Sequence, residues 1–363
     1  MQPGGLHGQA TWLGRVSVPL PTIDGRLARY QCRNNALAFD AFLQIEGEVR
    51  EAIKRFGSER IGVVVGTTTS GVEEANDAIA ALDRDGQFPA TFHYSQLEYG
   101  GLAEFLASAA GSGGPAYVIS TACSSSAKAI ASARTLIDSG LCDAVITGGV
   151  DSLARLTVRG FSALEAVSSQ RTLPFSRNRN GLNLGEAAAL FLMTRDAGGI
   201  QLSGVGESTD AHHMSAPNPT GEGAECAIRS ALNDADLQPD QIAYLNLHGT
   251  GTILNDSSEA NAVSRVFGCT VPCSSTKPRV GHTLGAAGAL EAAFCWLVMT
   301  QTDREIELPP HDFDGEYDPA LAKIRLVESG NLVVYGARFA TLTNSFGFGG
   351  NNCCLVLERE VNA

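Results

Sequence analysis

In the sequence VISTACSSSA, residues 118–127, an apolar strand pattern gives way to small residues that favour a helix. Cys123 lies at this junction. A thiol at a helix N-terminus is close to the positive end of the helix dipole, which favours the thiolate. The free N–H groups of the first helical turn can also receive an anion. Acyl transfer needs an activated sulfur beside such donors, although a lone cysteine is more often a buried structural residue.

Two other segments carry histidines at comparable junctions. YLNLHGTGT, residues 244–252, is an apolar run that ends in His248 and a Gly/Thr turn. STKPRVGHTLGAAGA, residues 275–289, is a loop with Lys277 and His282 that leads into a Gly/Ala-rich helix. Glycine-flanked junctions let the backbone approach a substrate closely. A single histidine of this kind is more often a surface or core residue. Only the three segments together indicate a catalytic site.

The composition is that of a well-buried globular protein. The chain has 363 residues, of which 44% are hydrophobic and 18% charged, enough for one large domain or two ordinary ones. A formal charge of −13 argues against nucleic-acid binding. Nine cysteines without metal-ligand spacing predict no metal site and a cytoplasmic location, where thiols stay reduced. No signal peptide or long apolar run indicates a membrane.

Strand and helix patterns alternate along two similar halves, 1–199 and 200–363, without a low-complexity linker between them. In the first half, strands are expected at 60–66, 116–120, 144–149 and 187–194, and helices at 103–110 and 125–139. In the second half, helices are expected at 226–235, 259–267 and 286–300, and strands at 242–247, 339–344 and 353–358. This alternation predicts an α/β fold with parallel sheets covered by helices on both faces. Reactive residues at the carboxyl ends of strands would then bring Cys123 against His248 and His282.

Together with NSFGFGGNN, residues 344–352, these segments resemble the β-ketoacyl-ACP synthases, the elongating condensing enzymes of the thiolase superfamily. The resemblance runs from about Ile61 to the C-terminus, and its four motifs occur in the family's order. It implies a thiolase-like, duplicated, five-layered α-β-α-β-α fold. It also implies decarboxylative Claisen condensation by a triad of Cys123, His248 and His282.

The resemblance assigns a role to each of these residues. Cys123 accepts an acyl group from the phosphopantetheine thioester of an acyl carrier protein (ACP), so the substrates bring the prosthetic group and no further cofactor is expected. The backbone N–H groups of Cys123 and Phe346 hold the oxyanion. His248 and His282, as neutral imidazoles, stabilise the enolate that malonyl-ACP leaves when it loses carbon dioxide. Phe346 on the glycine-flanked loop is also expected to act as a gate for the acyl chain.

Supporting residues follow from the same resemblance. Lys277 and Glu291 would pair behind the histidines, where the alternative is an exposed ion pair of little energetic value. Thr250 and Thr252, with help from Ser215, would hydrogen-bond the pantetheine arm, where the alternative for the threonines is to cap a turn.

The sequence departs from the family in several places. Residues 1–14 are glycine-rich and lack the family's first strand pattern. Because that strand is expected at the centre of its sheet, its loss would leave two strand edges unpaired, so either the start is misplaced or another segment takes its place; we favour a misplaced start. Asn-Gly-Leu at 180–182 replaces the usual Asp-Gly-Phe, and 252–256 lacks the usual Pro and Gly. With 210–217, these changes resemble pathway-specific enzymes such as those of bacterial aryl-polyene clusters.

Four other classes of protein could share part of this sequence pattern. A chain-length factor, the inactive partner subunit of some condensing enzymes, shares the fold but lacks the nucleophile, and it stays the main alternative. A biosynthetic thiolase needs a second cysteine near the C-terminus, where this chain has NSFGFGG and only then Cys353 and Cys354. An initiating synthase pairs His with Asn, and a non-enzymatic scaffold would not need the triad.

The expected partners are an acyl carrier protein and a second subunit. An acidic carrier protein needs a local basic patch, for which the candidates are Arg29 with Arg33, or Arg171 with Arg177 and Arg179. The run 117–120 is short, apolar and free of edge-protecting charge, so we expect it to pair with its counterpart in a dimer. A homodimer is expected first, and a heterodimer with a chain-length factor is the alternative.

Overall fold

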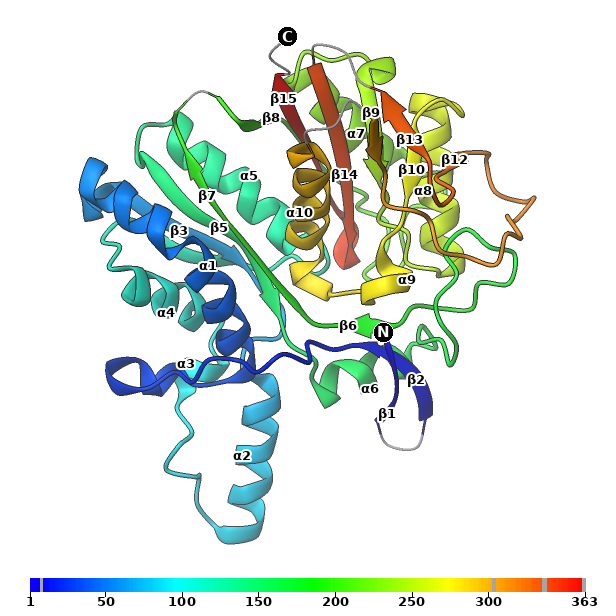
Figure 1. The fold of residues 1–363 in the computed structure, drawn as a ribbon. Coiled ribbons are helices and arrows are strands. Elements are labelled where there is room, and N and C mark those ends of the chain that lie inside the picture. Colours follow the sequence, from blue (N-terminus) through cyan, green and yellow to red (C-terminus); the bar gives the residue numbers. More distant parts are fainter. Residues whose placement is uncertain (7–8, 197, 302–304, 335–337, 361–363) are drawn as a thin grey trace.

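The computed structural model describes the chain except residues 7–8, 197, 302–304, 335–337 and 361–363 (Figure 1). Its first main sheet has the strand order β4-β3-β5-β7, and its second has the order β12-β10-β9-β14-β15-β8. The strands of the first are β3 (Ile61–Gly66), β4 (Ala116–Ile119), β5 (Ala144–Asp151) and β7 (Ala187–Thr194). Those of the second are β8 (Ile200–Thr209), β9 (Ile242–Asn246), β10 (Pro272–Ser274), β12 (Arg325–Leu326), β14 (Arg338–Gly347) and β15 (Asn351–Glu360).

Both sheets are mixed, so the prediction of parallel sheets is only partly right. β3, β4 and β5 are parallel, but β7 is antiparallel to β5. In the second sheet β15 is antiparallel to both β14 and β8. β14 and β15 are separated by η5 (Phe348–Gly350), a connection too short for the crossover that parallel strands need.

Helices and sheets alternate in five layers (Figure 1). α1 (Arg33–Phe56) and α4 (Gly100–Ala110) cover the outer face of the first sheet. α5 (Ser125–Asp138) and α10 (Ala287–Thr300) lie between the sheets, and α7 (Glu222–Asp234) and α8 (Ile253–Phe267) cover the second sheet. Only one of the 14 residues of α10 is charged, as expected for a helix enclosed by a protein interior.

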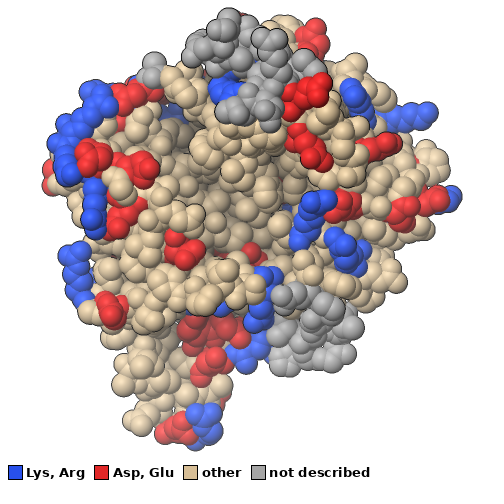
Figure 2. All heavy atoms as spheres, viewed as in Figure 1, with Lys and Arg blue, Asp and Glu red and all other residues tan. Residues whose placement is uncertain are grey.

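The two halves share one core. Ala127 and Ala189 of the first half pack in one cluster with Ala289, Cys295 and Phe339 of the second. Figure 2 shows the centre of one face as a mostly uncharged hollow with charged side chains around it. All strands of the four-stranded sheet come from 61–194 and all strands of the six-stranded sheet from 200–360. The division at residue 199 is compatible with this arrangement and stays a proposal.

The N-terminal segment differs from the prediction. β1 (Gln2–Leu6) and β2 (Gln9–Gly14) form an antiparallel hairpin, and β2 pairs with β6 (Leu184–Gly185). The prediction of no strand here is therefore wrong. In the second sheet β8 pairs with the outer edge of β15, whereas within the described residues the equivalent edge of β7 has no strand partner. The position of β8 at the edge of the second sheet indicates that the expected strand would pair with the β7 edge and not at the centre of the first sheet. The expectation of two unpaired edges inside the sheet is therefore wrong, because β3, β5 and β4 pair without a gap.

Most predicted elements are confirmed within a few residues, while α8 begins at Ile253, six residues before the predicted start. The remaining elements are short or peripheral, apart from α2, which projects from the bottom of the view in Figure 1. They are η1 (Gly25–Tyr30), η2 (Ser58–Arg60), α2 (Val72–Asp85), α3 (Tyr94–Leu97), α6 (Arg155–Ala163), η3 (Pro239–Gln241), α9 (Lys277–Val280), η4 (Leu284–Ala286), β11 (Glu305–Glu307) and β13 (Leu332–Val334).

Candidate active site

Cys123 lies in a tight turn between β4 and α5. Ala122 has a φ of 52°, a left-handed conformation that is unfavourable for a residue with a side chain. The Ser125 hydroxyl holds this turn, because it accepts from the Thr121 N–H at 2.8 Å and donates to the Ala122 carbonyl at 2.5 Å. The turn places Cys123 just before the first turn of α5, and its side chain is buried.

Both predicted histidines lie against this cysteine. His282 Nε2 is 2.9 Å from Cys123 Sγ. His248 follows the end of β9, and its ring centre is 5.4 Å from that of His282, nearly perpendicular to it. Both imidazoles are buried. The structure therefore brings the three residues of the expected triad together from both halves of the chain.

Burial determines the protonation of these groups. It lowers the pKa of both His248 and His282 well below the usual value, and the charge of Lys277 lowers them further. Both imidazoles are therefore neutral at neutral pH. Burial raises the pKa of the Cys123 thiol to about 12, although Lys277 and a hydrogen bond from the backbone of Phe348 oppose this shift. The expectation of a helix-stabilised thiolate is thus wrong, and the structure holds a thiol beside a neutral imidazole.

Cysteine sulfur and imidazole nitrogen are also the atoms that bind zinc in proteins. One ligand atom from each of Cys123, His248 and His282 lies within 4.8 Å of the others. Lys277 acts electrostatically on all three groups, and the three belong to the expected catalytic triad.

Lys277 and Glu291 form an ion pair between α9 and α10. Both side chains are buried, so the alternative of an exposed surface pair is wrong. Burial raises the pKa of Glu291 to about 7, and Lys277 opposes the shift. A buried pair of this kind is costly to break, because either partner alone would be an uncompensated charge.

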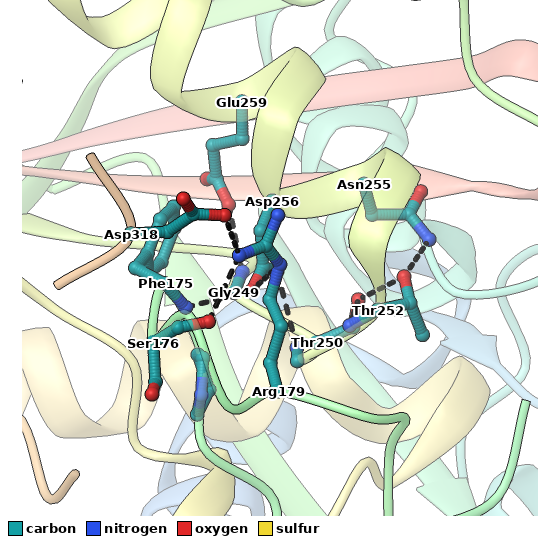
Figure 3. Close-up of polar contacts among 12 residues, drawn as sticks. Phe175, Ser176, Arg179, Gly249, Thr250, Thr252, Asn255, Asp256, Glu259 and Asp318 are labelled. Carbon is teal, nitrogen blue, oxygen red and sulfur yellow. Dashed lines mark hydrogen bonds and ion pairs between the residues drawn. The ribbon is translucent and has the colours of Figure 1, made fainter. Parts of the chain in front are cut away.

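Thr250 and Thr252 occupy the turn between β9 and α8 (Figure 3). Their hydroxyls lie 3.0 Å apart, and Asn255 Nδ2 donates to the Thr252 hydroxyl at 2.7 Å. The Gly251 N–H between them donates to Asp256 Oδ1 at 3.1 Å. The structure defines where the two threonines lie, and their binding of pantetheine stays a prediction.

A buried network lies beside this turn and supports it (Figure 3). Asp256 Oδ2 accepts from the Phe175 N–H at 2.7 Å and lies 3.8 Å from Arg179 Nε. Arg179 Nη1 donates to Asp318 Oδ2 at 2.6 Å and to the Ser176 carbonyl at 2.8 Å. Burial raises the pKa of Asp256 to about 7, while the Phe175 amide and Arg179 lower it.

Glu259 is a site residue that sequence reasoning missed. Its carboxylate accepts from the His248 N–H at 2.8 Å and the Gly249 N–H at 2.7 Å. Asn344 Nδ2 donates to the same group at 2.9 Å. Asp256 and Glu259 stand three residues apart in the first turns of α8, a spacing that would have shown them on one face had the helix been predicted to begin at residue 253.

The glycine-rich loop places Phe348, not Phe346, at the sulfur. Strand β14 continues to Gly347, so Phe346 is still paired with Asn352 in the ladder. Its ring lies 5.9 Å from that of His248, whereas the backbone of Phe348 hydrogen-bonds Cys123. A side chain on Gly347 would come within 2.8 Å of the Thr121 carbonyl, so glycine is needed for this close approach. The backbone of Phe348 is therefore better placed than that of Phe346 for the second oxyanion donor, and this role stays a prediction.

Ser215 lies in the loop next to the glycine-rich loop, and its binding role stays a prediction. The Gly349 N–H donates to the Met214 carbonyl at 2.8 Å, which joins the two loops. The Ser215 N–H itself donates to His213 Nδ1 at 3.2 Å.

Two of the candidate docking arginines are committed to internal contacts. Arg33 forms two hydrogen bonds to the buried Glu186 carboxylate, at 2.9 and 2.5 Å. Arg179 is buried, as described above. Burial removes Arg179 from the predicted basic patches, whereas Arg33 is half-buried and stays a candidate with Arg29, Arg171 and Arg177.

A duplicated five-layered fold that joins a cysteine at a helix N-terminus to two neutral histidines defines the acyl-transferring condensing enzymes of the thiolase-like class. Models of the β-ketoacyl synthase N-terminal and C-terminal domains match residues 43–197 and 200–305. The chain belongs to the β-ketoacyl synthase family.

Individual relatives agree with this membership. The 3-oxoacyl-[acyl-carrier-protein] synthase 2 of Staphylococcus aureus (strain COL) is 30% identical, over 93% of this chain and 84% of the relative. A ketosynthase (ApeO), solved in complex with its chain length factor (ApeC) from Xenorhabdus doucetiae, is 44% identical with a TM-score of 0.92, over 99% of this chain and 90% of that one. A β-ketoacyl synthase from Burkholderia phymatum STM815 is 28% identical with a TM-score of 0.86, over the same shares. Among the described residues, no helix has the length and apolar character needed to cross a membrane.

Proposed function

We propose that the chain acts as a 3-oxoacyl-ACP synthase that condenses an acyl group on Cys123 with malonyl-ACP. The observation that carries this proposal is the 2.9 Å contact between Cys123 Sγ and His282 Nε2, with a second neutral imidazole, His248, beside it. The Cys123 thiol can take the acyl chain, and the imidazoles of His248 and His282 can donate N–H bonds to an enolate.

In the first half-reaction Cys123 attacks the thioester carbonyl of acyl-ACP. Because the thiol is protonated at neutral pH, its proton passes to His282 Nε2 as the new S–C bond forms. The oxyanion is held by the backbone N–H groups of Cys123 and Phe348, and loss of one such donor costs about 2.7–4 kcal/mol. The carbonyl then re-forms, the pantetheine thiolate leaves, and His282 returns the proton to it.

In the second half-reaction malonyl-ACP loses carbon dioxide and its thioester becomes an enolate. His248 and His282 donate N–H bonds to the enolate oxygen, which neutral imidazoles can do without surrendering a proton. For His282 this step uses the tautomer with the hydrogen on Nε2, the nitrogen that faces the sulfur. The enolate carbon attacks the acyl carbonyl, the bond to Cys123 Sγ breaks, and the sulfur takes up a proton from solvent. Lys277 and Glu291 contribute a fixed charge pair behind the imidazoles.

The partners follow from the same proposal. Acyl carrier protein delivers both substrates, and their phosphopantetheine makes a separate cofactor unnecessary. β4 forms one edge of its sheet, and within the described residues that edge has no strand partner, which supports a dimer formed through it. The 44% identical ketosynthase was solved with its chain length factor, which supports a heterodimer and a specialised pathway such as aryl-polyene synthesis as alternatives to a homodimer. A cytoplasmic location is supported by nine cysteines that all remain unbridged.

A panel of acyl-ACPs with malonyl-ACP tests this function. The wild-type chain should release carbon dioxide and 3-oxoacyl-ACP. Cys123→Ala should bind carrier protein and form no product, and Cys123→Gln should still decarboxylate malonyl-ACP because both histidines remain. Failure of the wild-type chain with every primer, alone and with a chain-length factor, would instead support an inactive partner subunit.

A further inference from the structure

The carboxylate of Asp151 has a role that the triad does not explain. Asp151 ends β5 and is completely buried. Within the described residues no cationic side chain pairs with it, although a buried charge is costly unless it is compensated. It is compensated instead by six hydrogen bonds, all of which it accepts. The donors are Thr67 Oγ1, Thr68 N, Thr68 Oγ1, Thr69 N, Thr69 Oγ1 and Gly285 N.

These bonds join the two halves of the molecule. The threonines belong to the loop after β3 in the first half, whereas Gly285 lies in η4 of the second half. The Gly285 N–H donates to Asp151 Oδ2 at 2.6 Å. A side chain on Gly285 would lie only 2.8 Å from the same oxygen, so the contact requires glycine.

His282 lies three residues before Gly285, in a segment held at both ends. On one side the His282 N–H donates to the Asn183 carbonyl at 2.7 Å, and the His282 carbonyl accepts from the Gly185 N–H at 2.9 Å. On the other side Leu284 has a φ of 53°, a strained conformation that needs an external contact to hold it. Gly285 supplies that contact through Asp151.

The His282 ring has little else to hold it. Its Nδ1 atom is buried and has no hydrogen-bond partner in the described structure. Its orientation beside Cys123 therefore depends on the backbone on either side of it. We propose that Asp151 is a positioning residue, which anchors the turn Leu284–Ala286 and so keeps the His282 imidazole in contact with the Cys123 sulfur. This inference rests on the proposed function of the pair.

Asp151→Asn tests the proposal with almost no change in shape. An amide nitrogen in place of Oδ2 would face the Gly285 N–H and the Thr68 hydroxyl, and it cannot accept from the amide. We expect the turn to shift and the rate of Cys123 alkylation by iodoacetamide to fall by at least about 10-fold at pH 7.5, because His282 no longer receives the thiol proton efficiently. Asp143→Asn is the matched control: Asp143 precedes the same strand, and it pairs with Arg60 and Arg195 away from the site. Its alkylation rate should match the wild type.

A double variant separates positioning from general destabilisation. In a His282→Ala background, Asp151→Asn should change the alkylation rate by less than about 2-fold, since the residue through which it acts is gone. An equal, multiplicative loss in both backgrounds would overturn the proposal. If Asp151→Asn does not fold, Thr68→Val, which removes one hydroxyl from Oδ2, should give a smaller loss with the same dependence on His282. Alkylation needs no substrate, so a failure here is distinct from a wild-type chain that does not condense.

Discussion

At the scale of single residues, the Cys123 thiol and its two imidazole neighbours are all uncharged at neutral pH. The positive end of α5 is close to the sulfur, but burial outweighs it and keeps the proton on the thiol. The nucleophile is therefore formed together with proton transfer to His282, and not beforehand. This makes the contact between the two residues central to the first half-reaction.

The pH dependence of Cys123 alkylation follows from this state. A pKa of about 12 means that the thiolate fraction keeps rising through the alkaline range. We expect proton transfer to His282 to set the alkylation rate near pH 7, and the growing thiolate fraction to raise the rate further towards pH 10, without the plateau near 8.5 of an ordinary cysteine. Peptide mass mapping can follow Cys123 separately from the exposed Cys226, which serves as an internal control for delivery of the reagent. A plateau of Cys123 below pH 8 would contradict the buried thiol.

The two histidines should differ when each is replaced. His282 Nε2 contacts the sulfur directly, whereas the structure gives the His248 ring no hydrogen bond to it and Glu259 holds the His248 backbone. His248→Ala should therefore lose condensation, by about 100-fold or more, and keep acylation of Cys123. His282→Ala should slow both steps. Single-turnover acylation by acyl-ACP, measured beside the full reaction, separates them. Equal losses in both steps for both variants would show that the histidines act alike.

At the scale of secondary-structure elements, the early start of α8 places Asp256 and Glu259 beside the Thr250–Thr252 turn. Glu259 accepts hydrogen bonds from the backbone after β9, and Asp256 accepts one from the turn that precedes α8. The contribution of this network to the free energy of unfolding can be measured with variants that leave Cys123, His248 and His282 unchanged.

Arg179→Met should destabilise the protein by about 3 kcal/mol, because it leaves Asp256 and Asp318 without their cation in a buried site. Arg177→Met is a matched control two residues away, since Arg177 forms an exposed pair with Glu316 and should cost at most about 1 kcal/mol. Urea unfolding gives both free energies. Similar losses for the two variants would mean that the buried network contributes no more than a surface pair.

The elements also show what can be predicted from sequence. Cys123 and His248 can be predicted because each follows a short apolar strand, and His282 because it lies in a glycine-flanked loop that leads into a Gly/Ala-rich helix. Phe346 was chosen over Phe348 because glycine-rich sequence does not reveal where a strand ends, and here pairing with β15 extends β14 through Gly347. The hairpin of β1 and β2 was missed because its glycines carry little strand propensity and its pairing with β6 is a tertiary contact.

At the scale of the whole molecule, the edge strand β4 leads directly to the nucleophile. Subunit pairing along β4 would therefore fix the turn that carries Cys123. We expect a dimer that buries more than about 2,000 Å² in total. Light scattering at micromolar concentration should give twice the mass of one chain, or require co-expression with a chain-length factor. A stable and active monomer would contradict this.

An intact-mass pulse-chase experiment can follow the acyl group onto Cys123 and off it again. Incubation with acyl-ACP should add one acyl mass to the wild-type chain, and peptide mapping should place it on Cys123. A chase with malonyl-ACP should remove that mass and yield an equal amount of 3-oxoacyl-ACP, whereas Cys123→Ala should acquire no acyl group. Acylation that persists in Cys123→Ala, or an acyl group on Cys123 that malonyl-ACP does not discharge, would contradict the account.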